Sequence, residues 1–216
     1  MPPIDVARYV GAVTREVESR EVDGKMARAV LATRTYDTTI EDVWDALTNA
    51  ERIPRWFSPV TGDLKLGGRY QIQGNAGGTI TECEPPRRFA LTWEFGGGVS
   101  WVSVRLSADP KGGTRLELEH LAHVEEHWNK FGPGAVGIGW DLSLLGLSRH
   151  LETGAAVNLE EANGWAASEE GKTFMRLSGQ DWCRADVASG ADPETAKASA
   201  ARTVAFYTGD AQPDSS

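Results

Sequence analysis

Three histidines lie close together in the sequence. His120, His123 and His127 have the spacing H-x2-H-x3-H, with Glu125 and Glu126 between the last two. Imidazole and carboxylate groups at such short spacings are common zinc ligands. The pattern would need one continuous helix, however, whereas His120 ends a run that alternates like a strand, and no HExxH motif is present. We therefore predict no metal site and no cofactor.

Acid–base chemistry would need a titratable partner for His120. The candidates are Asp141 and Glu94, either of which could serve with His120 in a cyclase or hydrolase type of reaction. Asp141 lies about 100° from the apolar stripe of its predicted helix, so we expect it at a cavity edge or in solvent. No GxSxG motif is present, and EGKT at 170–173 lacks the glycine that a phosphate-binding loop carries five residues before Gly171. No residue is predicted to be catalytic.

His120 is also the strongest single candidate for a contact with a ligand. In TRLELEH, the alternation places His120 on the same side as Leu116 and Leu118, where an inward-facing apolar side chain is expected. A buried polar group without a partner costs about 1–3 kcal/mol, so His120 should bond to a side chain, a backbone group or a ligand. A satisfied core histidine and a ligand contact both remain open.

The elements that position these residues are strands followed by a long helix. Asp23-Gly24 predicts the turn of a first hairpin, and Thr38 or Thr39 can cap the helix that follows. A second short helix is expected to end before Pro54. Between residues 65 and 121, strand-like runs alternate with glycine-rich turns, as in an antiparallel meander. This order predicts an α+β fold with helices on one face of an antiparallel sheet.

The long helix is predicted for residues 131–152, FGPGAVGIGWDLSLLGLSRHLE, which are apolar yet rich in glycine. Ile138 belongs to one apolar stripe, which we expect the C-terminal helices at 164–208 to cover. The glycines at 139 and 146 indicate either close packing against a neighbour or room for a ligand. The opposite stripe, expected to face the sheet, consists of Val136, Trp140, Leu144, Leu147 and Leu151.

The composition is that of an ordinary globular protein, with 40% apolar and 25% charged residues. The net charge of -9 and the pI of about 5.0 disfavour nucleic acid and anionic membranes as partners. Cys83 and Cys183 are too few for a disulfide framework, and the N-terminus has no signal-like apolar run, so we expect a cytoplasmic protein. No segment is long and apolar enough to suggest a membrane span.

An ordered set of short motifs resembles the START-like, helix-grip superfamily (SRPBCC). The most specific of these motifs are Trp56-Phe57, Gly67-Gly68, Glu84-Pro85-Pro86, Leu91-Thr92-Trp93 and Gly139-Trp140. More narrowly, the chain from about Ala29 to Leu151 resembles the branch related to the C-terminal domain of the ATPase activator of the ninety-kilodalton heat-shock chaperone. The resemblance implies a curved antiparallel sheet gripping a long C-terminal helix, usually with a cavity between them.

The resemblance and the element pattern together divide the chain into four expected parts. Residues 1–28 are an N-terminal helix and the first hairpin strand, and residues 29–155 are the helix-grip domain. Residues 156–208 are a helical extension packed on the outer face of the long helix, and residues 209–216 are a disordered tail.

The resemblance implies binding more than catalysis. We predict a domain that binds an apolar small molecule between sheet and long helix. The alternatives are a protein-interaction module with a chaperone as partner, and a cyclase- or hydrolase-type enzyme. The predicted ligand-binding residues, chosen by strand parity, helix stripe and aromatic character, are Trp56, Phe57, Tyr70, Ile72, Leu91, Trp93, Val102, Leu118, His120, Val136, Trp140, Leu144 and Leu147. The ligand is expected to enter near Trp56-Phe57 and the turn at 74–78.

Overall fold

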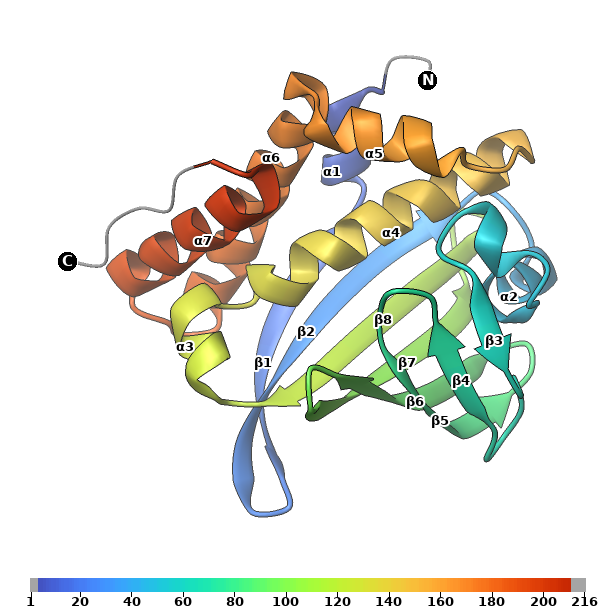
Figure 1. The fold of residues 1–216 in the computed structure, drawn as a ribbon, viewed down its shortest axis with the longest axis horizontal. Helices are drawn as coiled ribbons and strands as arrows, with labels where there is room; N and C mark the ends of the chain where they lie inside the picture. Colours follow the sequence, from blue (N-terminus) through green and yellow to red (C-terminus); the bar gives the residue numbers. More distant parts are fainter. Residues whose placement is uncertain (1–3, 211–216) are drawn as a thin grey trace. The chain divides into compact units, whose positions relative to one another are not determined.

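Eight strands form one antiparallel sheet in the computed structural model, which describes residues 4–210 (Figure 1). The strand order is β1-β2-β8-β7-β6-β5-β4-β3, so β3 to β8 form a continuous meander, as the alternating runs predict. The strands are β1 (Thr14–Val22), β2 (Lys25–Tyr36), β3 (Val60–Gly62), β4 (Arg69–Ile72), β5 (Gly77–Glu84), β6 (Arg88–Phe95), β7 (Gly98–Ala108) and β8 (Thr114–His123).

The helices complete an α+β fold. The short elements are α1 (Val6–Gly11), α2 (Ile40–Thr48), the 3-10 turn η1 (Ile53–Arg55) and α3 (Glu126–Phe131). The long helix α4 (Gly134–Thr153) is followed by α5 (Leu159–Ala167), α6 (Glu169–Ala188) and α7 (Pro193–Thr208). A curved antiparallel sheet that is followed in the sequence by a long helix is the helix-grip arrangement. The predicted fold class is therefore confirmed.

The chain divides into two compact units. The first comprises Met1–Ala32, His123–Leu142 and Asn158–Ser216, as far as these are described, and the second comprises Thr33–Ala122 and Ser143–Val157. The long helix α4 gives its first half to one unit and its second half to the other. Of the predicted tail, residues 211–216 lie outside the described residues, whereas Asp210 forms ion pairs with two side chains of α6.

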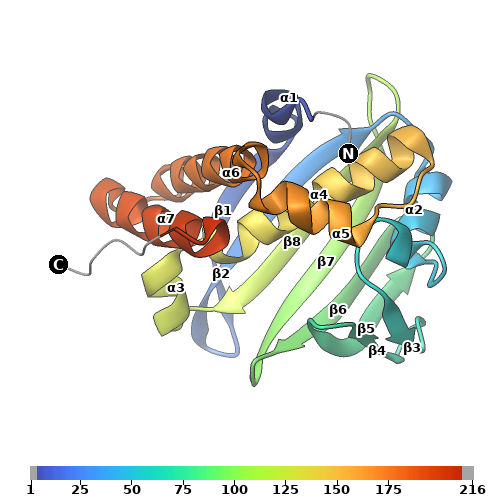
Figure 2. The same ribbon diagram turned by 45° about the horizontal axis from the view of Figure 1, so that its top comes forward.

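In the first unit, α6 is the central helix. It packs against α1, β1, α5 and α7, and α3 lies beside α7 (Figures 1 and 2). Asp192 caps α7, Pro193 is its first residue, and Gly209 ends it in the left-handed conformation, all as predicted. The turn of the first hairpin is also as predicted, since Asp23 and Gly24 both have positive φ.

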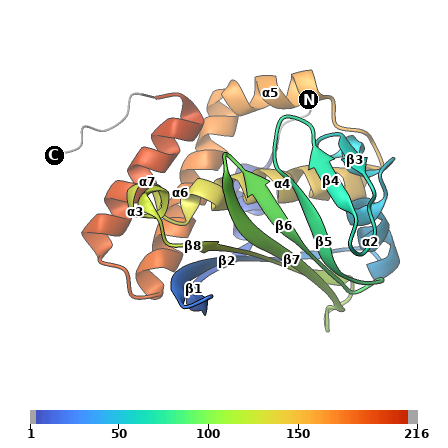
Figure 3. The same cartoon turned by 60° about the horizontal axis from the view of Figure 1, so that its bottom comes forward.

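In the second unit, α2 begins at its cap Thr39, whose side chain accepts a hydrogen bond from the backbone N–H of Asp42. The strands of this unit curve strongly (Figure 3). The expected end of a helix before Pro54 is wrong, because Pro54 lies inside η1. Proline is well suited to a first helical turn, where its missing N–H would have had no partner.

Two glycines inside α4 lie where other parts of the chain come close. A Cβ on Gly139 would lie 3.1 Å from the Tyr207 hydroxyl oxygen in the first unit. A Cβ on Gly146 would lie 2.6 Å from the Trp56 carbonyl oxygen in the second unit. Close packing therefore accounts for both glycines.

Candidate functional site

The candidate site is one face of the sheet in the second unit. Leu91 on β6 lies opposite Val102 on β7, and Val102 lies opposite His120 on β8. Residues directly opposite each other in an antiparallel sheet point to the same side. Trp93 and Leu118 are each two residues from a member of this row and share its face, as the alternation indicates.

Strand β4 continues the same face toward the sheet edge. Tyr70 lies opposite Gly78, and Ile72 lies opposite Val60 of β3. Both side chains are buried, and the Tyr70 hydroxyl donates a hydrogen bond of 2.8 Å to the carbonyl oxygen of Thr92. Burial raises the pKa of Tyr70, so its hydroxyl remains a donor at physiological pH.

The side chains on this face of the sheet differ in how deeply they are buried. Val102, Leu118 and His120 are buried, whereas Leu91 and Trp93 are half-buried. Phe95 follows Trp93 at the end of β6, and 63% of its surface is exposed. Part of an apolar face is therefore accessible beside a buried part, which is the composition expected of a surface that accepts an apolar molecule.

The remaining predicted residues lie on α4 and on the loop after η1. Trp56 and Phe57 are half-buried, and their ring centroids are 5.4 Å apart. Leu144 and Leu147 are buried in the second half of α4. Val136 and Trp140 are half-buried in the first half of α4, which belongs to the first unit, and their part in a ligand site stays a prediction.

His120 has a polar partner that the sequence pattern did not reveal. Its Nε2 lies 2.9 Å from the Ser100 Oγ, and the Ser100 hydroxyl donates to the Trp93 carbonyl oxygen at 3.2 Å. Because that single proton is used, Ser100 accepts the hydrogen bond and His120 carries its proton on Nε2. Ser100 has the same strand parity as Val102, so parity alone could have placed it on this face.

Burial lowers the pKa of His120 to about 4. The imidazole is therefore neutral at physiological pH, and its 4% exposure leaves little contact with water. The Trp93 ring lies beside it, with a centroid distance of 6.0 Å. The result is a neutral polar pair, Ser100 and His120, embedded in an apolar surface.

The two acids predicted as possible partners of His120, Glu94 and Asp141, each form other polar contacts. Glu94 points to the opposite face of the sheet, where its carboxylate pairs with Arg69 at 2.9 Å. Asp141 is in the first unit and is only 1% exposed, so its expected position at a cavity edge or in solvent is wrong. Arg15 and Trp182 donate to its Oδ2 at 2.9 and 3.1 Å, and Ser178 does so as well.

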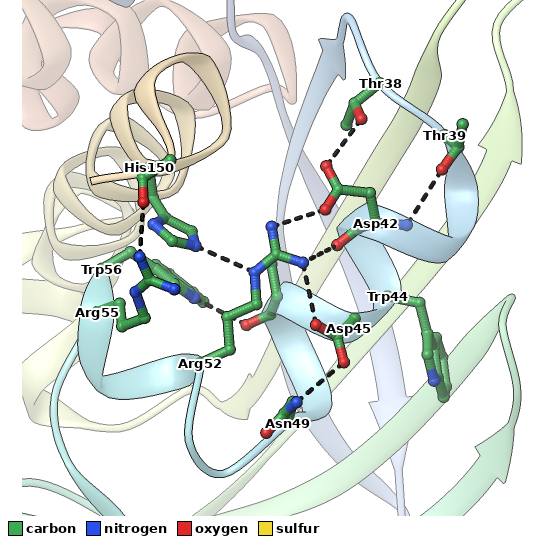
Figure 4. A network of polar contacts seen from close by, with 12 residues as sticks. Thr38, Thr39, Asp42, Trp44, Asp45, Asn49, Arg52, Arg55, Trp56 and His150 are labelled. Atoms are coloured by element: carbon green, nitrogen blue, oxygen red, sulfur yellow. Dashed lines mark hydrogen bonds and ion pairs between the residues drawn. The ribbon is translucent and has the colours of Figure 1, made fainter. Parts of the chain in front are cut away.

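A polar network fixes the loop that carries Trp56 (Figure 4). The Arg52 guanidinium donates to the carboxylates of Asp42 and Asp45 and, through Nε, to His150 Nε2 at 3.0 Å. His150 Nε2 is thus an acceptor, so Nδ1 carries the proton and donates to the Ala155 carbonyl at 2.8 Å. Hydrogen bonds from Asn49 and Arg52 lower the pKa of Asp45, which keeps its carboxylate charged.

The network joins α2, the start of η1 and the last turn of α4. The Trp56 indole N–H adds a bond of 2.8 Å to the Ala46 carbonyl oxygen. Contacts with α2 and with α4 therefore fix the loop at Trp56-Phe57, the predicted ligand entry, within the second unit.

Within residues 4–210, no group of three or more His, Cys, Asp or Glu side chains is arranged to hold a metal ion. Over the same part of the chain, no helix is both long enough and apolar enough to cross a membrane.

The fold and this apolar face define a helix-grip protein of the SRPBCC type. Residues 37–152 match the family described as Activator of Hsp90 ATPase homolog 1-like protein, and the chain belongs to this family. No curated protein matched the sequence.

Several solved structures are similar to this chain. CalU16 from Micromonospora echinospora is 33% identical, and the match covers 81% of this chain and 98% of that chain with a TM-score of 0.66. DynU16, a protein of the dynemicin biosynthetic locus, is 20% identical, with 59% of this chain and 48% of that chain covered and a TM-score of 0.54. MLL2253 from Mesorhizobium loti is 23% identical over 58% of this chain and 97% of that chain, with a TM-score of 0.52. The last two show the fold alone, whereas the CalU16 match reaches beyond residues 37–152 into segments that the sequence resemblance had left out.

Proposed function

We propose that the protein binds an apolar small molecule against the face that contains Leu91, Trp93 and Val102, without catalysing a reaction. The observation that carries this proposal is the half-buried Leu91 and Trp93 beside the buried Val102, Leu118 and His120. A fully packed core would bury all of these side chains, because protein interiors leave few gaps. Membership in a helix-grip family supports a binding role.

The other predicted residues take supporting parts in this proposal. Tyr70 and Ile72 extend the surface along β4, and Trp56 and Phe57 flank the entry. Leu144 and Leu147, in the half of α4 that belongs to the same unit, supply further apolar contacts.

Native mass spectrometry of the purified protein tests the proposal directly. We expect an added mass at 1:1 stoichiometry that denaturing extraction releases as an apolar molecule. For a ligand found in this way, titration should change the fluorescence of the wild-type protein and of Trp101→Phe, and this change should be much smaller in Trp93→Phe.

Trp101 is a matched control because it lies on the adjacent strand but on the opposite face, paired with Thr92 and Leu121. An equal response of Trp93→Phe and the wild-type protein would contradict the assigned face. A protein that carries no molecule and binds none from a panel of apolar compounds would contradict the function itself.

Contact with a chaperone is the second candidate function, because the family is described by its likeness to an Hsp90 ATPase activator. Exposed Phe95 and Val99, at the tip of the β6–β7 hairpin, offer an apolar contact point. The test measures the ATPase rate of an Hsp90-type chaperone with and without this protein. An unchanged rate and no co-sedimentation would remove this candidate.

A further inference from the structure

Ser100 and His120 are the polar feature of an otherwise apolar stretch of the proposed binding face. Ser100 lies opposite Trp93, and the next row of the same face pairs Leu91 with Val102 and His120. Ser100, like Leu91 and Trp93, is half-buried rather than buried. A molecule lying on Leu91 and Trp93 would therefore meet the Ser100 hydroxyl.

The two hydrogen bonds of the Ser100 hydroxyl group differ in length. The contact with His120 Nε2 is 2.9 Å long, close to the most common length, whereas the bond to the Trp93 carbonyl oxygen is 3.2 Å long. A hydroxyl proton rotates freely about the C–O bond. The Ser100 proton can therefore leave the bond to the Trp93 carbonyl oxygen at little cost, while His120 continues to donate to the Ser100 Oγ. Hydrogen bonds in such a chain strengthen one another in a surrounding of low polarity.

We propose that Ser100, held in place by His120, donates a hydrogen bond to an acceptor oxygen, such as a ketone carbonyl, on an otherwise apolar ligand. This inference rests on the proposed function and adds the chemical class of the ligand. His120 acts as a positioning residue, because it contacts the ligand only through Ser100.

A matched pair of probes tests the assignment with the full chain. 2-Acetylnaphthalene carries an acceptor oxygen, and 2-ethylnaphthalene has nearly the same shape without it. The measured quantity is the ratio of their dissociation constants in the wild-type protein and in variants, by isothermal titration or fluorescence. A net hydrogen bond of about 0.5–1.5 kcal/mol corresponds to roughly a twofold to tenfold change in affinity.

Ser100→Ala should reduce the preference for the ketone by that factor and leave the affinity for 2-ethylnaphthalene nearly unchanged. Ser100→Thr keeps the hydroxyl and suits a strand, so it should keep the preference. Ser103→Ala is the control, because Ser103 lies on the same strand but on the opposite face, paired with Ala90 and Glu119.

An unchanged preference in Ser100→Ala would overturn the role of Ser100 while leaving the proposed function in place. Equal weakening by Ser100→Ala and Ser103→Ala would also overturn it, since the effect would then be a general loss of structure. Failure of both probes to bind the wild-type protein would overturn the proposed function and this inference together.

Discussion

At the scale of single residues, His120 shows how burial sets the state of a group. The imidazole is buried among apolar side chains, and its Nε2 proton is directed at Ser100. Burial disfavours the charged form and lowers the pKa of His120 to about 4. A neutral donor that does not titrate at physiological pH can hold Ser100 in one orientation, which is what the proposed ligand contact needs.

This pKa shift predicts a stability that depends on pH. The unfolded chain protonates His120 below about pH 6.5, whereas the folded protein keeps it neutral down to about pH 4. The unfolded state binds more protons in this interval, so stability is fully present above pH 6.5 and is lost as the pH falls toward 4. Between pH 7 and pH 5 the free energy of unfolding should fall by about 2 kcal/mol from this group.

Urea unfolding of the wild-type protein and of His120→Gln at both pH values isolates the contribution. Glutamine keeps an N–H donor but does not titrate, so other groups contribute equally to both proteins. The same pH dependence in the two proteins would contradict the neutral, buried assignment of His120.

At the scale of elements, the loop with Trp56 is fixed by the second half of α4. The Trp56 carbonyl approaches Gly146, and Arg52, the residue before η1, donates to His150, which lies one helical turn after Gly146 in α4. Trp56 is predicted to flank the entry of the binding face. The position of this aromatic side chain therefore depends on a helix about 90 residues later in the sequence.

Gly146→Ala should therefore destabilise the protein, although alanine normally favours a helix over glycine. The added methyl group would lie 2.6 Å from the Trp56 carbonyl oxygen, and such overpacking costs about 1–3 kcal/mol. Gly164→Ala in α5 is the matched control, since nothing lies within 4 Å of the added group. That variant should stabilise by about 0.5–1 kcal/mol. Thermal unfolding of both variants measures the difference, and a stabilising Gly146→Ala would contradict the close approach.

At the scale of the whole chain, one buried cluster joins segments that are far apart in the sequence. Arg15 from β1 pairs with Asp141 from α4 and Asp181 from α6, and Ser178 and Trp182 also donate to Asp141. Arg15 has only 3% of its side chain exposed, and burial raises the pKa of Asp141 although Arg15 opposes that shift. The cluster connects the N-terminal region, the long helix and the C-terminal extension within the first unit.

Removing one charge of this cluster should cost more than removing both. Asp141→Leu leaves the buried Arg15 charge with Asp181 as its remaining carboxylate partner, and breaking a buried ion pair typically destabilises by about 3–5 kcal/mol. Adding Arg15→Met should recover part of this loss, because apolar residues of similar size can replace a buried ion pair. Urea unfolding of the single and double variants provides the comparison. A single variant within about 1 kcal/mol of the wild-type protein would show that the ion pair contributes little.

The sequence by itself determined the features that depend on near neighbours along the chain. The alternation of β6, β7 and β8 placed Leu91, Val102 and Leu118 on one face, because successive strand residues point to opposite sides. Turn and cap residues such as Asp23-Gly24 and Asp192 act within three or four positions, so they were also predictable. The motifs of the family fixed the fold class.

Only the tertiary structure decided which distant side chains meet. Ser100 and His120 are 20 positions apart, and their bond depends on the register between β7 and β8. The helical wheel predicts Asp141 at a cavity edge or in solvent because it describes α4 alone, whereas the partners that bury Asp141 come from β1 and α6. Periodicity fixes the direction of a side chain relative to its own element. Which residues lie in that direction depends on how the chain folds. That fold depends on packing between residues far apart in the sequence, which a local pattern does not describe.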